Sequence, residues 1–314
     1  MATIAEQLTS LANTKTAIKD AIVAKGVTVA DSDPFSAYPT KIGEIQGGGG
    51  GTPATKFGAS VDAFLGGVDE NGVYVPPSNT QDSPVVFDFS AIKKINSLTM
   101  KRLLAGMKKY FSVDFSNLEE VSLDGLYEFA GLESLGETSY FLYADLSKLR
   151  VIDESGLENF AYRQYMFIGD SNKHLNLGSL ETVGRYGLQN AFNTTELLES
   201  ADLSLLKTVG YYGMYGTFVS SGLKTVNLDS LETIDTRGLS SCFRGTQIPS
   251  ISFPALISVQ TDSFGNSSST YCFGNQYYIK EIHFRADMQA KIEAMTGYAN
   301  RFGAQADCII YFDL

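Results

Sequence analysis

Hydrophobic positions recur along residues 84 to 284 in units of 25 to 31 residues. One apolar residue of each unit serves as its reference position, and the separations between successive reference positions are 26, 31, 31, 26, 25, 25 and 31. Apolar residues also recur two positions before the reference position and three, six and eleven positions after it. Because five columns agree along the region, we interpret it as a repeat array. The reference positions are Phe89, Phe115, Leu146, Leu177, Leu203, Leu228, Phe253 and Phe284.

Two periods within each unit predict its geometry. Val226 and Leu228 alternate with Asn227, which predicts a short strand with two side chains in the core and one directed outward. The apolar residues three and six positions after the reference position no longer alternate, and they predict a turn or short helical segment that folds back over the same core. A phenylalanine 14 or 15 positions after the reference position then closes the unit. Glycine ten positions after it predicts a left-handed or tightly packed corner, at Gly125, Gly156, Gly187, Gly213 and Gly238.

The fold class predicted by this pattern is an α/β solenoid of short parallel strands with irregular or short helical returns. A single unit cannot bury its own apolar stripe, so its stability depends on stacking against its neighbours. The solenoid is expected over 85–284, with an N-terminal cap over 56–84 and a C-terminal cap over 285–314. The apolar columns fail at Asp287 and Ala290, which marks the start of the C-terminal cap.

The units resemble a known repeat class. The segment "LKTVNLDSLETIDTRGLSSCF" (223–243) is similar to the BspA-like class of bacterial leucine-rich repeats, whose units combine a strand, a short apolar return and a segment that ends in Phe. The resemblance covers about residues 84–284 and implies a leucine-rich-repeat fold and a role in surface adhesion. The chain departs from common leucine-rich repeats because it lacks a regular Asn at the inner turn, and its 31-residue units carry insertions.

The first 46 residues have a different pattern. Apolar residues with a spacing of four and three positions, interrupted at Lys15 and ended by Gly26, predict a helix of about 22 residues. The stripe is narrow, so we expect a partner protein or sister chains to bury it, and a homo-oligomer, with a trimer favoured. The glycine-rich segment 47–55 is predicted to be a flexible linker. The apolar positions of the helix are Ile4, Leu8, Leu11, Ile18 and Ile22.

A second resemblance follows this helix. Residues 26–45 are similar to a segment near the N-termini of phage and prophage structural proteins, in which a helix precedes a Pro-Phe-x-x-Tyr-Pro-x-Lys-Ile motif. The resemblance implies attachment of residues 1–46 to other virion proteins, through Phe35, Tyr38 and the apolar helix positions. The motif residues here are Pro34, Phe35, Tyr38, Pro39, Lys41 and Ile42.

Charge and composition exclude several classes of function. A formal net charge of -11 and a pI near 4.7 argue against nucleic acid and anionic membranes as partners. The N-terminus carries no secretion-signal pattern, so we expect synthesis in the host cytoplasm. This agrees with the localisation in the virion that the resemblance to phage structural proteins implies. Three cysteines without metal spacing, only two histidines and no nucleophile elbow or phosphate loop lead us to expect no catalytic residue, metal or cofactor. We expect the cysteines Cys242, Cys272 and Cys308 to be reduced core residues.

Two sets of side chains are candidates for binding. The residues one position before each reference position would form an outward column that could bind a cation or glycan hydroxyls, or could be a solvated polar face. Its candidate binding members are Asp114, Asp145, Asn176, Asp202 and Asn227. Tyrosines outside the apolar columns suit recognition of carbohydrate or protein, although they could instead seal the edges of the solenoid. Such tyrosines include Tyr140, Tyr143, Tyr162 and Tyr165, and the candidate binding members are Tyr211, Tyr212, Tyr215, Tyr277 and Tyr278.

Together these features predict a structural protein of a phage or prophage virion, a fibre or decoration protein. Its N-terminus would attach to the particle and its repeats would bind a host surface glycan or protein. An alternative is a bacterial cell-surface adhesin of the same repeat class, which would need a secretion signal or an anchor. A third is a solenoid enzyme that degrades glycans, which would need a carboxylate pair about 5 to 9.5 Å apart in a groove.

Overall fold

A computed structural model describes residues 84–104, 110–131, 140–164, 167, 173–275 and 277–314. It also describes eight residues of the N-terminal region, which are Lys15, Thr16, Ile18, Lys19, Ile22, Val23, Val29 and Ala30. The chain divides into two compact units, Met1–Phe57 and Gly58–Leu314, and each is described by itself.

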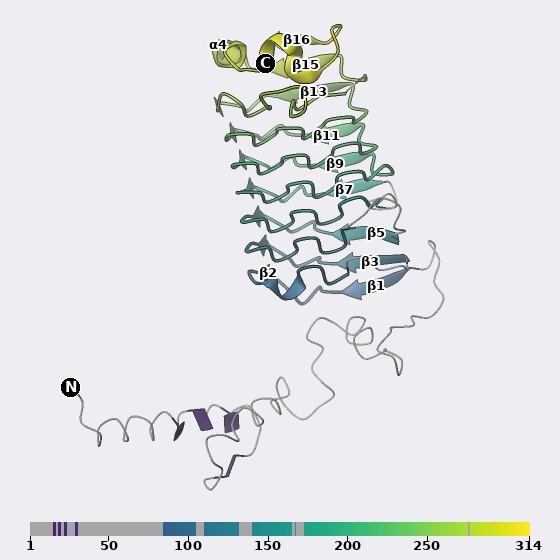
Figure 1. Cartoon of the computed structure of the whole chain (residues 1–314), viewed down its shortest axis with the longest axis vertical. Helices are drawn as coiled ribbons and strands as arrows, with labels where there is room; N and C mark the ends of the chain where they lie inside the picture. The colour runs from purple at the N-terminus through teal and green to yellow at the C-terminus, as the bar shows by residue number, and fades with distance from the viewer. Residues whose placement is uncertain are drawn as a thin grey trace, which may run out of the picture. The chain divides into compact units, whose positions relative to one another are not determined.

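Parallel strands stack one above another along the second unit (Figure 1). They form three open sheets of three strands, and in the first two each strand pairs with that of the next sequence unit. The first sheet contains β1 (Val85–Asp88), β3 (Tyr110–Asp114) and β5 (Tyr140–Asp145). The second contains β7 (His174–Asn176), β9 (Ser200–Asp202) and β11 (Thr225–Asn227). The third contains β13 (Ser250–Phe253), β15 (Glu281–Phe284) and β16 (Ile309–Phe312).

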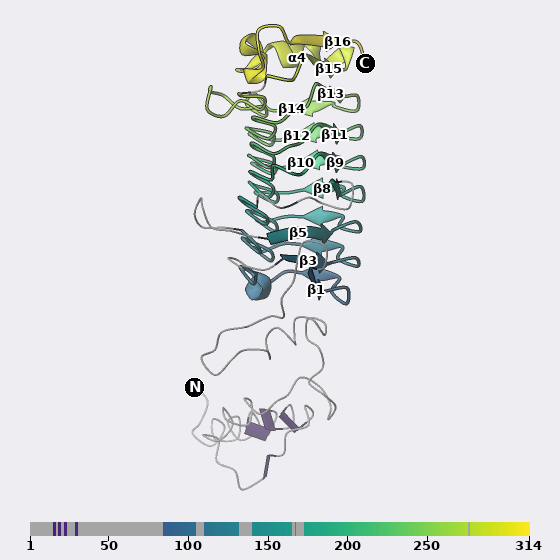
Figure 2. The same cartoon turned by 90° about the vertical axis from the view of Figure 1, so that its right-hand side faces the viewer.

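A second series of strands runs alongside the first (Figure 2). Each strand has only two residues, yet the seven form one continuous parallel sheet in sequence order. The pairing with parallel neighbours gives a fold compatible with a repeat or solenoid-like architecture. The strands are β2 (Lys94–Ile95), β4 (Glu120–Val121), β6 (Val151–Ile152), β8 (Thr182–Val183), β10 (Thr208–Val209), β12 (Thr233–Ile234) and β14 (Ser258–Val259).

The returns that follow this second series are successions of turns. In the described part of residues 96–275, the short 3-10 helix η2 (Leu98–Met100) is the only helix. Backbone N–H groups alternate between two kinds of acceptor: that of Gly125 donates to Ser122 O at 3.0 Å, and that of Leu126 donates to Gly156 O of the next unit at 2.8 Å. The turns therefore satisfy their backbone through the neighbouring unit, and of the two predicted conformations the turn is confirmed.

The predicted apolar columns form the core. The side chains of all five columns are at most 5% exposed, with three exceptions. The columns are the reference position, the position two before it, and the positions three, six and eleven after it. Val226, which belongs to the last strand of the second sheet, is half-buried, and so are Ile92 and Val259 near the two ends of the array. The three cysteines are also buried and form no disulfide.

Glycines at the corner are required by close packing. A Cβ atom on Gly156 would lie 2.8 Å from Val121 O, and one on Gly125 would lie 2.5 Å from Ile95 Cγ2. These glycines do not have positive φ, so the tightly packed corner is the correct alternative. The left-handed conformation occurs one residue earlier, at Asp124, Ser155, Tyr186, Tyr212 and Arg237, with φ values of 54° to 61°.

Phenylalanine rings form a stacked series along the core. Phe129 and Phe160 stack with their centroids 5.5 Å apart, and a second run continues through Phe192 and Phe218 at 5.8 Å. The two runs meet edge to face at 71°, where the phenylalanine moves from 14 to 15 positions after the reference position. The rings thus extend one apolar interior from unit to unit.

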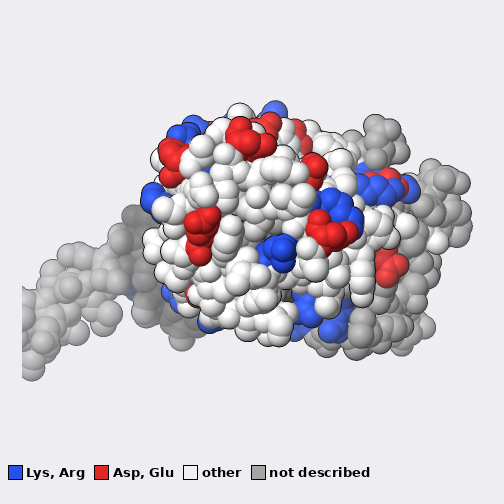
Figure 3. All heavy atoms as spheres, turned by 90° about the horizontal axis from the view of Figure 1, so that it is seen from above, with Lys and Arg blue, Asp and Glu red and all other residues white. Residues whose placement is uncertain are grey.

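The C-terminal segment closes one end of the stack with η3 (Ala286–Met288), α4 (Gln289–Glu293), η4 (Tyr298–Gly303) and β16. Phe302 covers Phe264 with 4.9 Å between ring centroids. Lys291 Nζ donates to Ile257 O at 3.0 Å, which satisfies a carbonyl beside the last two-residue strand. Seen end-on, charged groups of both signs are interspersed among uncharged residues (Figure 3).

The first unit is described at eight residues only. Ile18 and Ile22 are helical, as predicted, and Ile18 packs against the buried pair Ile22 and Val29. Val29 thus helps to bury Ile22 within the same chain, and burial of the stripe by a partner protein or sister chains stays a prediction. No helix among the described residues is long and apolar enough to cross a membrane. The other predicted attachment residues lie outside the described residues: Ile4, Leu8, Leu11, Phe35 and Tyr38.

Candidate functional site

The outward column divides into three runs that follow the three sheets. Asp88, Asp114 and Asp145 pair in register on β1, β3 and β5. Asn176, Asp202 and Asn227 pair in register on β7, β9 and β11. Ser252 and His283 pair on β13 and β15. The sheets therefore align the candidate binding residues within each run, as predicted for stacked parallel strands.

The Asp and Asn members of this column shape the chain as it leaves each strand. In every case Oδ1 accepts a hydrogen bond from the backbone N–H two residues later, at 2.8 to 3.0 Å. This arrangement is an Asx turn, for which Asp and Asn are suited because their short side chains reach the following backbone. The column consequently has a structural role beyond solvation. The six residues are Asp88, Asp114, Asp145, Asn176, Asp202 and Asn227.

The two exceptions in the column support this explanation. Two residues after Ser252 stands Pro254, which has no backbone N–H to donate, so an acceptor at Ser252 would have no such partner. His283 instead contacts Asp313, with 2.9 Å between Nδ1 and Oδ1, and stacks on Tyr311. Where the turn lacks a donor or the chain enters the C-terminal segment, the Asx residue is replaced.

The turn role limits the chemistry available to the column. The Ser90 hydroxyl and backbone N–H both donate to Asp88 and lower the pKa of that carboxyl. Among the described residues, no three His, Cys, Asp or Glu side chains come together as a metal site. A shallow hollow of about 410 Å³ lies over β9 and β11, lined by His174, Ser200, Asp202 and Asn227 among others. This hollow offers hydroxyl, amide and carboxylate groups for hydrogen bonds.

Tyrosines gather on the returns. Tyr211 and Tyr212 lie with ring centroids 4.6 Å apart, and Tyr215 lies 5.3 Å from Tyr212. Tyr186 of the preceding unit joins them at 5.7 Å from both Tyr211 and Tyr212, a member that the sequence interpretation missed. Tyr277 and Tyr278 are exposed, at 72% and 54%, and no ring contact joins either of them to this group. The structure thus brings together three of the five predicted tyrosines.

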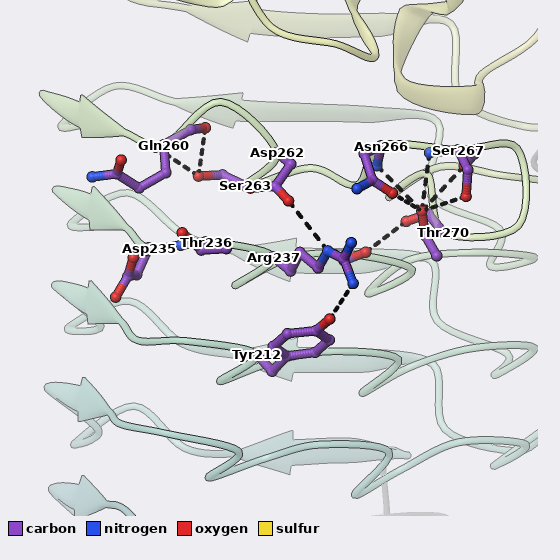
Figure 4. A network of polar contacts seen from close by, with 11 residues as sticks. Tyr212, Asp235, Thr236, Arg237, Gln260, Asp262, Ser263, Asn266, Ser267 and Thr270 are labelled. Carbon is purple, nitrogen blue, oxygen red and sulfur yellow. Dashed lines mark hydrogen bonds and ion pairs between the residues drawn. The ribbon is translucent and has the colours of Figure 1, made fainter.

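Two arginines complete the group, which we call the tyrosine patch: Arg185, Tyr186, Tyr211, Tyr212, Tyr215 and Arg237. Arg185 lies over the rings of Tyr186 and Tyr211, at 5.0 and 5.9 Å from their centroids. Arg237 lies 5.4 Å from the Tyr212 centroid, donates to the Tyr212 hydroxyl, and also donates to Asp262 at 3.2 Å (Figure 4). Cation–π contacts of this kind hold the rings and guanidinium groups together.

The surroundings alter the acidity of two groups in the patch. Desolvation, followed by the neighbouring Tyr186 and Tyr212, raises the pKa of Tyr211. The hydrogen bond to Tyr212 is the main cause that raises the pKa of Arg237. Both groups therefore keep their protons at neutral pH: Tyr211 stays a neutral donor and acceptor, and Arg237 stays a cation.

Repeat offsets are the signal that would have identified five of the six patch members, all except Tyr215. Tyr186, Tyr212 and Arg237 each stand nine positions after a reference position, and Arg185 and Tyr211 stand eight after. Residues at one offset in successive units lie beside each other in a stack. Alignment of the polar offsets, as well as the apolar ones, would have placed them together.

A separate acidic group lies on the returns nearer the N-terminal end of the stack. Burial is the main cause that raises the pKa of Glu158, assisted by Asp124 and Glu128. Gln189 Nε2 donates to Glu158 Oε1 at 2.9 Å. Burial also raises the pKa of Tyr127 to about 12, with Lys101 Nζ 4.2 Å from its ring centroid. These contacts join neighbouring units, so we assign the group to the stability of the stack.

The chain has no significant match among protein-family models, curated proteins or solved structures.

Proposed function

We propose that the stack is a leucine-rich-repeat solenoid of the BspA-like kind. The order of elements in a unit supports this: a strand, a two-residue strand and a return of turns that ends at a buried phenylalanine. The resemblance of residues 223–243 to that class rests on the same order. The described parts of the 31-residue units keep this order.

We propose further that the chain is a structural adhesion protein of a phage or prophage virion, either a fibre or a decoration protein. Residues 1–46 would attach to other virion proteins, and the repeats would bind a glycan or protein on the host surface. The observation that carries the proposal is the tyrosine patch, a group of aromatic and cationic side chains on the returns, on a unit distinct from Met1–Phe57. Aromatic side chains with polar tips are suited to recognition because little conformational entropy is lost on binding.

A bacterial cell-surface adhesin is the second candidate, and the resemblance to BspA-like repeats favours it. Genes for capsid or tail proteins beside the gene for this chain would separate the two. A glycan-degrading enzyme has less support, because the outward aspartates accept hydrogen bonds in Asx turns.

Deletion of residues 1–46 tests the attachment role. We expect the shortened protein to be lost from purified particles, while its thermal unfolding midpoint matches that of the full chain and its circular dichroism lacks only the signal of the N-terminal helix. The matched control is Lys207→Gln, a change on the exposed side of the stack that should leave incorporation unchanged. Normal incorporation of the shortened protein would contradict the proposal.

A further inference from the structure

We propose that the tyrosine patch binds a glycan that carries a carboxylate, with Arg185 pairing with the carboxylate and Tyr186 and Tyr211 packing against sugar rings. The inference rests on the proposed function, because it names the class of ligand that the repeats would bind. Three features of the patch support it: the guanidinium group of Arg185, the tyrosine rings held in place by contacts between units, and the hydrogen-bonding groups of the exposed side chains.

Of the two arginines in the patch, Arg185 is the one without a carboxylate partner among the described residues. Its side chain is exposed, and no carboxylate of the described residues lies within 4.0 Å of its guanidinium group. Its backbone is held, since its N–H donates to Asp153 Oδ1 at 2.8 Å. Arg237 differs, because Asp262 neutralises it at 3.2 Å. A guanidinium group presents parallel N–H donors that match a carboxylate, so Arg185 is equipped for a bidentate pair with a ligand.

Contacts with neighbouring units hold the tyrosine rings of the patch in place. The chain of contacts from Tyr212 through Arg237 to Asp262 links three successive units and fixes the ring of Tyr212 (Figure 4). Tyr212 in turn contacts Tyr186, Tyr211 and Tyr215. Backbone hydrogen bonds also join the units here, with Tyr186 N–H donating to Tyr211 O at 3.1 Å. A surface that is ordered before binding loses little entropy when the ligand arrives.

The exposed groups favour a sugar over a protein segment. Tyr211 is 40% exposed, Tyr186 is partly exposed, and Arg185 lies over both rings, so aromatic and cationic side chains are presented to solvent together. The apolar faces of sugars pack on such rings and their hydroxyls bond to phenols, whereas protein hot spots favour desolvated pockets that receive an anchor. The net charge of -11 opposes long-range attraction of an anion, so binding must depend on local contact at Arg185.

The test uses the full-length protein and an array of purified bacterial uronic-acid polysaccharides, each beside its carboxyl-reduced form. We expect at least one acidic polysaccharide to bind at least ten-fold more tightly than its reduced form. Arg185→Gln should remove this difference and leave binding of the reduced form unchanged. Tyr211→Ala should weaken binding of both forms, and Tyr211→Phe should restore most of the packing.

Two controls separate binding from folding. Arg150→Gln removes an exposed arginine that pairs with Glu181 on another column, and it should bind as the unaltered protein does. Arg185→Gln should keep the thermal unfolding midpoint of the parent, because the side chain of Arg185 is exposed and makes no ion pair with a described residue.

The outcomes distinguish the inference from the proposed function. Equal binding of acidic and reduced forms, or binding unaffected by Arg185→Gln, would overturn the inference and leave adhesion intact. Binding to host cells or to a host protein, without binding to any polysaccharide of the array, would do the same. Binding to neither polysaccharides nor host cells would reject the proposed function as well.

Discussion

At the scale of single residues, turn chemistry explains much of the polar sequence. Each Asp or Asn at the end of a strand accepts a hydrogen bond from the backbone N–H two residues later. Two positions before Pro254 the residue is Ser252, because proline has no N–H to donate. Either Asp or Asn occupies this position in different units, because both side chains supply an Oδ1 acceptor. The corner glycines follow from a different constraint, since neighbouring carbonyls leave no room for Cβ.

Substitution of Asp202 separates a turn role from a charge role. Asp202→Asn keeps the acceptor for Ser204 N–H, so we expect little loss of stability, whereas Asp202→Ala removes it and should cost about 1 kcal/mol. Urea unfolding of the two variants beside the parent measures the difference. Equal destabilisation by both would show instead that the charge of Asp202 matters.

At the scale of elements, residues of alternating charge lie next to the two-residue strands and form ion pairs between neighbouring units. The residues four positions after the first six reference positions are Lys93, Glu119, Arg150, Glu181, Lys207 and Glu232. Lys93 Nζ lies 3.8 Å from Glu119 Oε1, and Arg150 Nε lies 2.9 Å from Glu181 Oε1. From Glu119 onward, the backbone N–H of each residue in this series donates to the backbone carbonyl of the preceding residue in the series. Opposite charges in neighbouring units favour this pairing of the units, because a pairing that skipped one unit would place like charges opposite each other, such as Glu119 and Glu181.

A second charge group predicts how stability depends on pH. Lys173 and Lys224 lie 2.5 and 2.7 Å from the carboxylate of Glu199 and lower its pKa from 4.5 to about 2. Since the folded pKa is the lower one, these pairs stabilise the fold above about pH 4.5 and the contribution is lost as the pH falls toward 2.

We expect Glu199→Gln to be less stable than the parent at pH 6 and to approach it at pH 3, with a smaller difference in high salt. Thermal unfolding at the two pH values and two salt concentrations measures this. A difference that does not change with pH would mean that the hydrogen bonds of Glu199, and not its charge, stabilise the stack.

At the scale of the whole molecule, the stack needs its ends covered. The interior is a series of rings and aliphatic side chains in which each unit covers the next, so an uncapped end exposes a complete layer. At the C-terminal end β16 pairs with β15, and Phe302 and Phe312 lie against Phe264 and Phe284.

Deletion of residues 285–314 therefore should expose Phe264, Phe284 and the edge of β15. We expect the shortened protein to aggregate, because an unpaired apolar edge invites association between chains. Size-exclusion chromatography measures the outcome, and the chain that lacks residues 1–46 is the control of comparable size. A monomeric, fully folded product would show that the C-terminal segment is not a cap.

The hydrophobic pattern alone determined the stacking of the chain and the composition of its core. Residues such as Leu177, Leu180 and Val183 recur at constant offsets because each must be buried in the same interior. Burial depends on residue type and spacing within one unit, so the sequence alone predicts it. The alternation at β7 and β9 was predictable for the same reason. Val226 was not, since its half exposure depends on its place in the last strand of the second sheet.

Tertiary structure decided what the polar residues do. Tyr186, Tyr212 and Arg237 share the position nine residues after a reference position, and each has a left-handed backbone there. Only the stacking of successive units brings Arg185 over two tyrosines and Asp262 within hydrogen-bond distance of Arg237. Likewise, only the turn after each strand shows that the Asp and Asn oxygens accept backbone N–H groups. Burial of apolar side chains depends on residue type and spacing, whereas polar contacts depend on direction and distance, which are set when units 25 to 31 residues apart come together.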